Sequence, residues 1–288
     1  MPFPESELVL NQDGSFYHLN LLPEHIADTI IAVEDPGRVH SVSQHFDAIT
    51  FEMNRREFIT HTGIYKGKEI TVVSTGMGTD NIEIVLTELD ALVNIDLKKR
   101  EVKSRRKKLK IIRIGTSGSL QQDLKLEEHV VTDFAIGFDS LMLFYNLKQT
   151  DYELSISQKI ADDLKLNFQP YCVRGSEKLL KKIGLRMATG NTVTTPGFYA
   201  PQGRNLRLNL KMPNLIKDLN YFHHENFWLS NFDLESAGYY AMARLLGHEM
   251  ISVNTVISNR ITNKFSKNPA KSLNALIQKV LDRIKSIE

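Results

Sequence analysis

The sequence predicts an α/β fold, in one domain that covers residues 1–288. Short β-branched apolar segments alternate along the chain with segments whose apolar residues recur at helical spacing. Most of the expected strands run into loops rich in glycine or proline. No internal repeat, low-complexity linker or shift in composition divides the 288 residues. Alternating strands and helices form one layered core, and ligands of such folds bind in the loops at the strand ends.

The first half of the chain carries clear strand and turn signals. We expect strands over residues 29–33, 59–65, 69–73 and 111–114. The first of them runs into a turn at 34–38 that contains proline and glycine. The second and third form a hairpin, and a glycine-rich turn at 74–78 then precedes a helix from Ile82. Strand, turn and helix in this order form an α/β unit.

The second half continues the alternation. Strands are expected over residues 130–136, 192–195 and 251–258, and helices over residues 155–166 and 235–246. Asn268 and Pro269 open a last helix as cap and first-turn proline. Its apolar residues recur on one face from Leu273 to Ile287, which predicts a buried stripe.

Charge and cysteine content exclude several classes of protein. The chain has 36 Lys and Arg against 34 Asp and Glu, a balance that indicates neither a nucleic-acid nor a membrane partner. Residues 98–110 are strongly basic but lack interleaved aromatics, so we favour a solvated loop over a nucleic-acid surface. Cys172 is the single cysteine, which excludes an internal disulfide and fits a cytoplasmic setting. Residues 1–10 lack the pattern of a signal peptide, and no stretch predicts a membrane span.

Four expected strand-end loops carry polar groups that suit an anion: residues 35–38, 76–79, 113–118 and 231–236. The third of them offers the Arg113 guanidinium, two hydroxyls and backbone N–H groups that glycines leave accessible, which suits phosphate. It is not a Walker loop, and the glycines at 76–78 lack the third member of a dinucleotide fingerprint. The alternative is an arginine paired with a carboxylate, with glycines needed only for turns.

The order of the motifs points to a family. The motifs are Tyr17-His18-Leu19, Asp35-Pro36-Gly37-Arg38-Val39, Arg56-Glu57-Phe58, Ser74-Thr75-Gly76-Met77-Gly78, Arg113-Ile114-Gly115-Thr116-Ser117-Gly118, Phe198-Tyr199-Ala200-Pro201-Gln202-Gly203-Arg204, Asn231-Phe232-Asp233-Leu234-Glu235-Ser236 and Asn259-Arg260. In this order and spacing they resemble the uridine phosphorylase branch of the nucleoside phosphorylase family, over nearly the whole chain. The resemblance implies a central mixed sheet flanked by helices and the cleavage of a pyrimidine nucleoside by phosphate, most simply uridine to uracil and ribose 1-phosphate.

The resemblance also implies a role for individual residues. Arg38, Arg113 and Thr116 would bind phosphate, together with Arg56 of a neighbouring subunit. Glu235 would bind the ribose 2′- and 3′-hydroxyls, Leu234 would pack on the sugar, and His18 of the neighbouring subunit would meet the 5′-hydroxyl. Asp233 stands where the family has a glutamate, and its role is left open. The base site would contain the residues Gln202, Arg204, Phe198, Ser117, Gly118 and Arg260.

The choice of base follows from the chemistry of these groups. The Gln202 amide offers one donor and one acceptor, which match an edge of uracil, and the Arg204 guanidinium can stabilise a departing base anion. Purine-cleaving relatives carry an aspartate after the late strand, where this chain has Asn259 and Arg260. The sequence therefore favours pyrimidines.

One position departs from the family pattern. Glu34 stands where relatives have a glycine whose N–H faces phosphate, and an inward carboxylate would repel the anion. An outward Glu34 is compatible with phosphorolysis, although a positive φ would strain it by about 1 kcal/mol. Two alternatives stay open: a hydrolytic nucleosidase in which Glu34 activates water, and a non-catalytic nucleoside-binding homologue. Retention of Arg38, Arg56 and Arg113 favours phosphorolysis.

The resemblance implies a homo-oligomer with sites completed across a dimer interface, arranged as a hexamer. It implies no organic cofactor and no catalytic metal, with phosphate as co-substrate. Relatives can hold a monovalent cation near the glutamate that matches Glu57, where Met77 and Asn81 stand at the neighbouring ligand positions.

Overall fold

The computed structural model describes residues 2–287. These residues form two compact units. Unit 1 contains residues 2–113 with Met242–Glu249, and unit 2 contains Ile114–Ala241 with residues 250–287. The division falls within β7 (Lys110–Ser119), within α6 (Ser236–Leu246) and at the first residue of β14 (Glu249–Asn259). The α/β class with mixed strand directions is confirmed, and a single domain over residues 1–288 stays a prediction.

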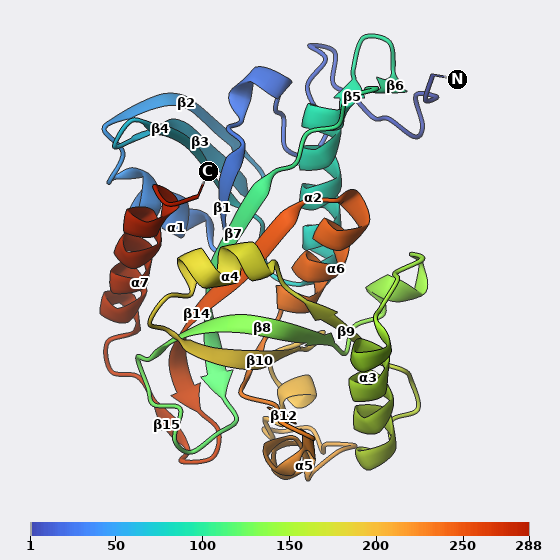
Figure 1. The fold of residues 1–288 in the computed structure, drawn as a ribbon, viewed down its shortest axis with the longest axis vertical. Coiled ribbons are helices and arrows are strands. Elements are labelled where there is room, and N and C mark those ends of the chain that lie inside the picture. The colour runs from blue at the N-terminus through green and yellow to red at the C-terminus, as the bar shows by residue number, and fades with distance from the viewer. Residues whose placement is uncertain (1, 288) are drawn as a thin grey trace. The chain divides into compact units, whose positions relative to one another are not determined.

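Unit 1 contains a mixed sheet with two main helices (Figure 1). Its elements are η1 (Pro23–His25), β1 (Thr29–Val33), α1 (Pro36–Ser43), β2 (Ala48–Arg55), β3 (Phe58–Tyr65), β4 (Lys68–Ser74), α2 (Thr79–Asn94), β5 (Ile95–Asp96) and β6 (Glu101–Val102). The strand order is β7, β1, β4, β3, β2. β1 is parallel to β4 and β7, whereas β3 is antiparallel to its neighbours. The β1–β7 register sets Ala32 beside Arg113. Ala32 is two residues before Glu34, so Arg113 lies near the end of β1.

Unit 2 is built on a second group of paired strands, in which β8 and β10 lie side by side (Figure 1). Its elements are β8 (His129–Gly137), η2 (Leu141–Leu143), α3 (Asp151–Asp163), β9 (Tyr171–Arg174), α4 (Glu177–Ile183), β10 (Ala188–Thr194), η3 (Ala200–Gln202), α5 (Leu215–Tyr221), β11 (His223–His224), β12 (Phe227–Trp228), β13 (Asn231–Asp233), β15 (Lys264–Phe265) and α7 (Pro269–Ile284). β10 is parallel to β8 and β13, whereas β9 and β14 are antiparallel to β8.

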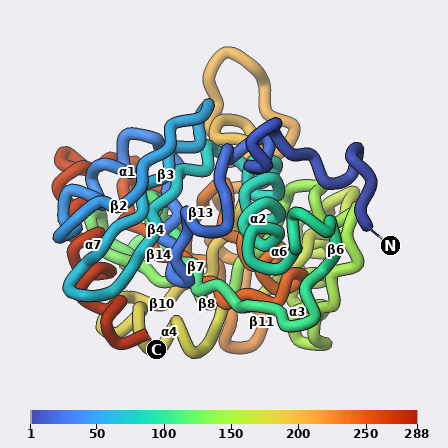
Figure 2. Tube along the Cα trace, turned by 90° about the horizontal axis from the view of Figure 1, so that it is seen from above, coloured from blue at the N-terminus to red at the C-terminus, as the bar shows by residue number. Residues whose placement is uncertain are grey.

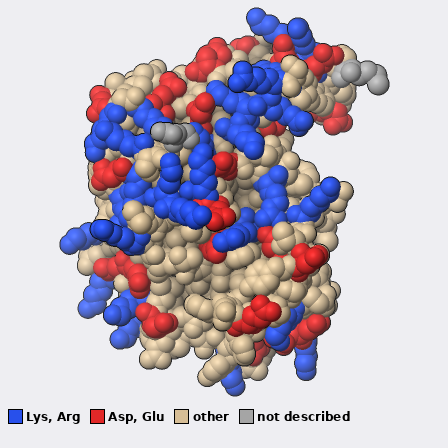
Figure 3. Space-filling model, in the orientation of Figure 1, with Lys and Arg blue, Asp and Glu red and all other residues tan. Residues whose placement is uncertain are grey.

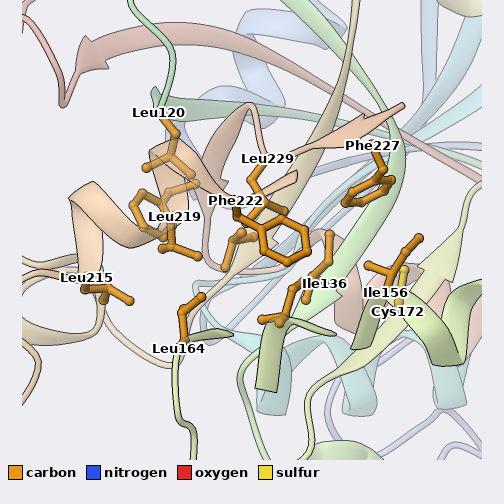
Figure 4. Packing of buried hydrophobic residues seen from close by; sticks show 13 residues of the cluster. Leu120, Ile136, Ile156, Leu164, Cys172, Leu215, Leu219, Phe222, Phe227 and Leu229 are labelled. Atoms are coloured by element: carbon orange, nitrogen blue, oxygen red, sulfur yellow. The ribbon is translucent and has the colours of Figure 1, made fainter. Parts of the chain in front are cut away.

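Apolar side chains from several elements of unit 2 form one buried cluster (Figure 4). Ile156 and Ile160 of α3 pack there with Phe222, Phe227 and Phe232. Burying an aliphatic or aromatic side chain stabilises a fold by about 1.5–3 kcal/mol, so this cluster stabilises β13, which contributes Phe232. Figure 2 shows residues 205–212, in gold, as a projecting loop of unit 2, and its Leu206 is 73% exposed.

Three expected loops differ in the structure. Residues 115–118 continue β7, and Pro36–Ser43 form a helix directly after β1. Asp35 accepts a hydrogen bond from the Gly37 N–H and Pro36 occupies the first turn, so the proline-containing turn is also a helix start. Gly118 is needed inside the strand because a Cβ there would come 2.8 Å from Ser258 Oγ. Likewise, β13 takes up the first three residues of the loop expected at 231–236.

The basic segment of unit 1, residues 98–110, contacts earlier parts of the chain. Arg100 donates to the carbonyls of Phe3, Pro4 and Leu8, and Lys107 pairs with Asp28 at 2.5 Å. Figure 3 shows blue side chains among red ones on the visible face. These contacts are what a solvated loop would make. Within residues 2–287, no helix combines the length and apolarity that a membrane span requires.

Candidate active site

Two arginines and a carboxylate lie together in unit 1. The Glu34 carboxylate is in ion-pair contact with Arg38 through Oε1 and Nη1. Its Oε2 lies 3.9 Å from Nη2 of Arg113, which is 1% exposed. The structure thus brings Arg38 and Arg113 together, as expected of a phosphate site. Glu34 also points inward, toward both guanidinium groups, and does not take the outward orientation named above as compatible with phosphorolysis.

The backbone explains how this cluster forms. β1 ends at Val33, Glu34 follows, and α1 begins at Pro36, which sets Arg38 in the first turn of the helix. Glu34 lacks a positive φ, so the glutamate causes no left-handed strain. It is 9% exposed, and a buried carboxylate is stable only when cations or donors surround it. The two guanidinium groups meet that need.

A second group of predicted residues gathers elsewhere in unit 1. The Tyr17 ring lies 5.0 Å from the His18 ring and 5.2 Å from the guanidinium carbon of Arg56. Arg56 has φ 55° in the turn between β2 and β3, a left-handed backbone conformation that residues other than glycine seldom adopt. Tyr17 therefore links the two residues that the family resemblance assigns to a neighbouring subunit.

Glu88 of α2 holds His18 in place. Its Oε1 lies 2.7 Å from His18 Nδ1 and accepts the His18 backbone N–H at 3.2 Å. Its Oε2 accepts the Leu19 N–H at 2.8 Å. When the ring is neutral, the hydrogen bond to Glu88 places the proton on Nδ1 and leaves Nε2 as an acceptor.

The position suggested for a cation contains a glycine in a tight turn. Gly76 has φ 70°, and a Cβ there would come 3.3 Å from Cγ of Glu57. Asn81 Nδ2 donates to the Met77 carbonyl at 3.4 Å. Residues 2–287 contain no cluster of three or more His, Cys, Asp or Glu that could hold a metal ion. The monovalent cation near Glu57 stays a prediction.

Four of the residues expected to bind the base meet in unit 2. Arg204 Nη1 donates to the Phe198 carbonyl at 2.5 Å and to Gln202 Oε1 at 2.6 Å. The Arg204 guanidinium carbon lies 3.5 Å from the centroid of the Phe198 ring. Arg260 Nη1 donates to the Gln202 carbonyl at 2.6 Å. The sequence motifs at 198–204 and 259–260 thus converge on one cluster.

The Gln202 amide is held at both ends. Its Nε2 lies 3.1 Å from Thr195 Oγ1 and 3.3 Å from the Asp233 carbonyl, and Oε1 accepts from Arg204. A carbonyl oxygen has two lone pairs, so Oε1 keeps the capacity for a second donor such as an imide N–H. The contact with Asp233 joins the base cluster to the residues expected to bind ribose.

The electrostatics of the base cluster favour an anion. Burial, followed by the nearby positive charge of Arg260, lowers the pKa of Arg204 to about 10. Burial also lowers the pKa of Arg260. Lowered arginine pKa values mean that the protein holds these two positive charges unfavourably, and a negative charge on a bound base would offset that.

Asp233 supports the ribose segment from within. Its Oδ1 accepts from Thr194 Oγ1 at 2.7 Å and from the backbone N–H of Glu235 and Ser236 at 3.3 Å. Asp233 therefore accepts hydrogen bonds from backbone N–H groups at the N-terminal end of α6. Glu235 is 2% exposed and Leu234 is half-buried. The residue expected to bind ribose thus lies directly before α6, in a buried position.

The remaining predicted residues lie on β7 of unit 2. Thr116 is half-buried and Ser117 is buried. Ser117 Oγ finds no hydrogen-bond partner within residues 2–287, and a ligand could supply one. Gly118 approaches the base cluster, because a Cβ there would lie 3.8 Å from Cγ of Arg260.

Asn259 has a structural role. Its Nδ2 donates to the carbonyls of Gln121 and Leu124, and its Oδ1 accepts the N–H groups of Ile261 and Thr262. All hydrogen-bonding groups of the Asn259 amide bind backbone groups, so none is available to contact a purine base.

Sequence reasoning missed Glu88 and the contact role of Tyr17. Glu88 lies between Val85 and Leu92 on the apolar stripe of α2 and is 7% exposed. A carboxylate within a buried stripe needs a partner, and that signal was readable. The identity of the partner, 70 residues earlier in the chain, was not.

Comparison with known proteins gives one family. The model described as "Phosphorylase superfamily" matches residues 28–285. A uridine phosphorylase of Thermococcus kodakarensis is 28% identical over 92% of this chain and 85% of its own length. A purine nucleoside phosphorylase of Buchnera aphidicola is 26% identical over 93% of this chain and 98% of its own.

Solved structures show the same fold. A Trypanosoma brucei nucleoside phosphorylase, described as having uridine phosphorylase activity, superposes with a TM-score of 0.89 at 28% identity. The match covers 97% of this chain and 99% of that one. A uridine phosphorylase of the oomycete Phytophthora capsici has a TM-score of 0.71 at 20% identity over the full length of both chains, a likeness of fold alone.

Proposed function

This chain belongs to the phosphorylase superfamily, and we propose that it cleaves a pyrimidine nucleoside by phosphorolysis, with uridine and phosphate giving uracil and ribose 1-phosphate. The observation that carries the choice of base is the cluster of Gln202, Arg204 and Arg260. An amide beside two guanidinium groups matches the acceptors and the imide N–H of uracil. Asn259, engaged with backbone, offers no acid for a purine.

The reaction requires charge stabilisation at three points. Phosphate attacks the anomeric carbon, the glycosidic bond breaks, and its electron pair leaves with the base, which then takes a proton. Arg38 and Arg113 would hold the attacking phosphate, with Thr116 and the Arg56 of a neighbouring subunit. Arg204 and Arg260 would stabilise the departing uracil anion, and Glu235 would stabilise the positive charge that develops on the ribose.

Hydrolysis by Glu34 is less well supported. A general base must face a water next to the sugar, whereas both Glu34 oxygens face guanidinium groups. The contact with Arg38 holds the carboxylate at the anion site. The uridine phosphorylase and nucleoside phosphorylase relatives favour phosphorolysis over a binding-only role as well.

The oligomer is also part of the proposal. We infer a homo-oligomer, in the family's hexameric arrangement, in which one subunit supplies His18 and Arg56 to the site of its neighbour. The contacts that support it are those of Tyr17, which touches both residues and would present them together. The enzyme would act in pyrimidine salvage in the cytoplasm, where a buried thiol such as that of Cys172 stays reduced.

Uracil release from uridine tests the proposal. The purified protein is assayed with and without phosphate, and ribose 1-phosphate is measured as the second product. We expect cleavage that requires phosphate, and a loss of about 10²-fold or more in Arg38→Gln. Arg55→Gln, an exposed arginine beside Arg56, is the matched control and should retain activity. Uracil release that is independent of phosphate would contradict the proposal, as would no release from any pyrimidine nucleoside.

A further inference from the structure

We propose that Glu34 makes the anion site selective for a protonated oxyanion, so that it accepts phosphate and rejects sulfate. This inference rests on the proposed phosphorolysis and adds a specificity-determining residue to it. The carboxylate is held within the arginine pair and accepts a hydrogen bond from a P–O–H group of the incoming phosphate.

Geometry places the carboxylate at the arginine pair itself. Oε1 contacts Arg38, and Oε2 lies 3.9 Å from Arg113 Nη2. An anion bound by both guanidinium groups must therefore lie next to at least one Glu34 oxygen. Arg113 and Glu34 are 1% and 9% exposed, so surrounding side chains restrict movement of either group away from the other.

Chemistry then separates the two anions. An ionised carboxylate can only accept hydrogen bonds, so an oxyanion oxygen without a proton meets it as a second acceptor and is repelled. A P–O–H group instead donates a short, charge-assisted bond to the carboxylate. At neutral pH both forms of inorganic phosphate keep a proton, whereas sulfate keeps none. A site that pairs with a substrate O–H group rejects an analogue that lacks it.

The charge balance agrees with this role. Two guanidinium groups carry two positive charges, and Glu34 cancels one of them without leaving the site. Attraction for anions in general is therefore weaker than for the arginine pair alone, and a specific hydrogen bond must supply the difference. A glycine at this position would leave the full positive charge and no discrimination.

The alternative is that Glu34 moves away from the arginine pair when any anion binds, and so acts as a gate that does not distinguish between anions. A gate would weaken the binding of every anion by the same factor. If Glu34 instead acts as a selectivity filter, it changes the ratio of the sulfate inhibition constant to the phosphate KM. This ratio is the quantity to measure.

The experiment measures the phosphate KM and the sulfate inhibition constant against phosphate, with uridine saturating, for the full-length protein. In the wild type we expect the sulfate constant to exceed the phosphate KM by at least about tenfold. In Glu34→Gln the amide can donate to sulfate, and the ratio should fall by roughly tenfold or more. Glu34→Gly should lower the ratio too, and Glu69→Gln, an exposed carboxylate of β4, should leave it unchanged.

An unchanged ratio in both Glu34 variants, with the two constants moving together or not at all, would overturn the inference. Thermal unfolding of the same proteins with phosphate or sulfate gives a second readout that needs no turnover. Stabilisation of the wild type by phosphate alone, and of Glu34→Gln by both anions, supports the filter. Equal stabilisation of the wild type by both anions contradicts it. Absence of phosphate-dependent uracil release from the wild type would instead contradict the proposed function, while the unfolding data would still decide the role of Glu34.

Discussion

The Nδ1 atom of His18 lies 2.7 Å from Oε1 of Glu88, and the same carboxylate accepts the backbone N–H groups of His18 and Leu19. One buried side chain thus holds the backbone and the ring of a half-buried residue of unit 1. When the His18 ring is neutral, this contact leaves Nε2 as an acceptor, which suits a sugar hydroxyl.

Glu88→Gln should weaken recognition of the ribose 5′-hydroxyl. An amide cannot accept at both ends, so one of the N–H groups of residues 18 and 19 loses its partner and His18 is misplaced. We expect the preference for uridine over 5′-deoxyuridine, measured as a ratio of kcat/KM, to fall by about tenfold. His18→Ala should lose the same preference, and Glu83→Gln on the same helix should keep it. A wild-type ratio in Glu88→Gln would show that Glu88 is structural only.

Mixed subunits should restore activity if sites are shared. Arg56→Ala removes a residue given to the neighbour, and Glu235→Ala removes one kept by the chain, so each variant alone should be nearly inactive. When the two are refolded or co-expressed together, half of the dimers formed at random contain one intact site. Activity should then return to about a quarter of the wild-type value. No recovery in assemblies shown to be mixed would place Arg56 in the site of its own chain.

Asp233→Ala should reduce stability through loss of the cap of α6. Asp233 accepts from Thr194 Oγ1 and from two N–H groups at the helix start, all of which would lose their partner. We expect a decrease of about 2 kcal/mol in the free energy of unfolding, measured with denaturant. Asp218→Ala, an exposed aspartate of α5, should change it by less than about 0.5 kcal/mol. Equal effects of the two substitutions would contradict the capping role.

Arg204→Gln should separate activity from stability. It should lower kcat/KM for uridine by about 10²-fold, because it removes a group that stabilises the uracil anion. The folded chain holds the Arg204 proton less tightly than an ordinary arginine, with a pKa of about 10, so the charge costs stability below that pH and the cost is lost as pH rises through it. The variant should therefore unfold no more readily than wild type at neutral pH, and its advantage should shrink near pH 10. A marked loss of thermal stability at neutral pH would refute this.

Local signals in the sequence are sufficient for much of the fold. The expected strands at 29–33 and 59–65 correspond to β1 and β3, and Pro269 opens α7 as predicted. Asp35-Pro36 predicts a turn, although the same pair is a cap and first-turn proline, and only the following residues distinguish the two. The glycines at 115–118 predict a loop, whereas in the structure a close strand neighbour requires one of them.

The site is predictable where a motif carries its own chemistry. Gln202 and Arg204, two residues apart in one motif, are both expected at the base site, and they contact each other. The orientation of Glu34 is not predictable, because it depends on the β1–β7 register that sets Arg113 beside β1. Glu88 escapes prediction for the same reason, since its partner is distant in the chain.

The most decisive measurement is the fate of oxygen during uridine cleavage in ¹⁸O-labelled water with unlabelled phosphate. Attack by phosphate, held by Arg38 and Arg113, predicts ribose 1-phosphate with no label at the bridging oxygen of C1. Free ribose that carries the label at C1 at the earliest times would show that water is the nucleophile, and would contradict the phosphorolysis.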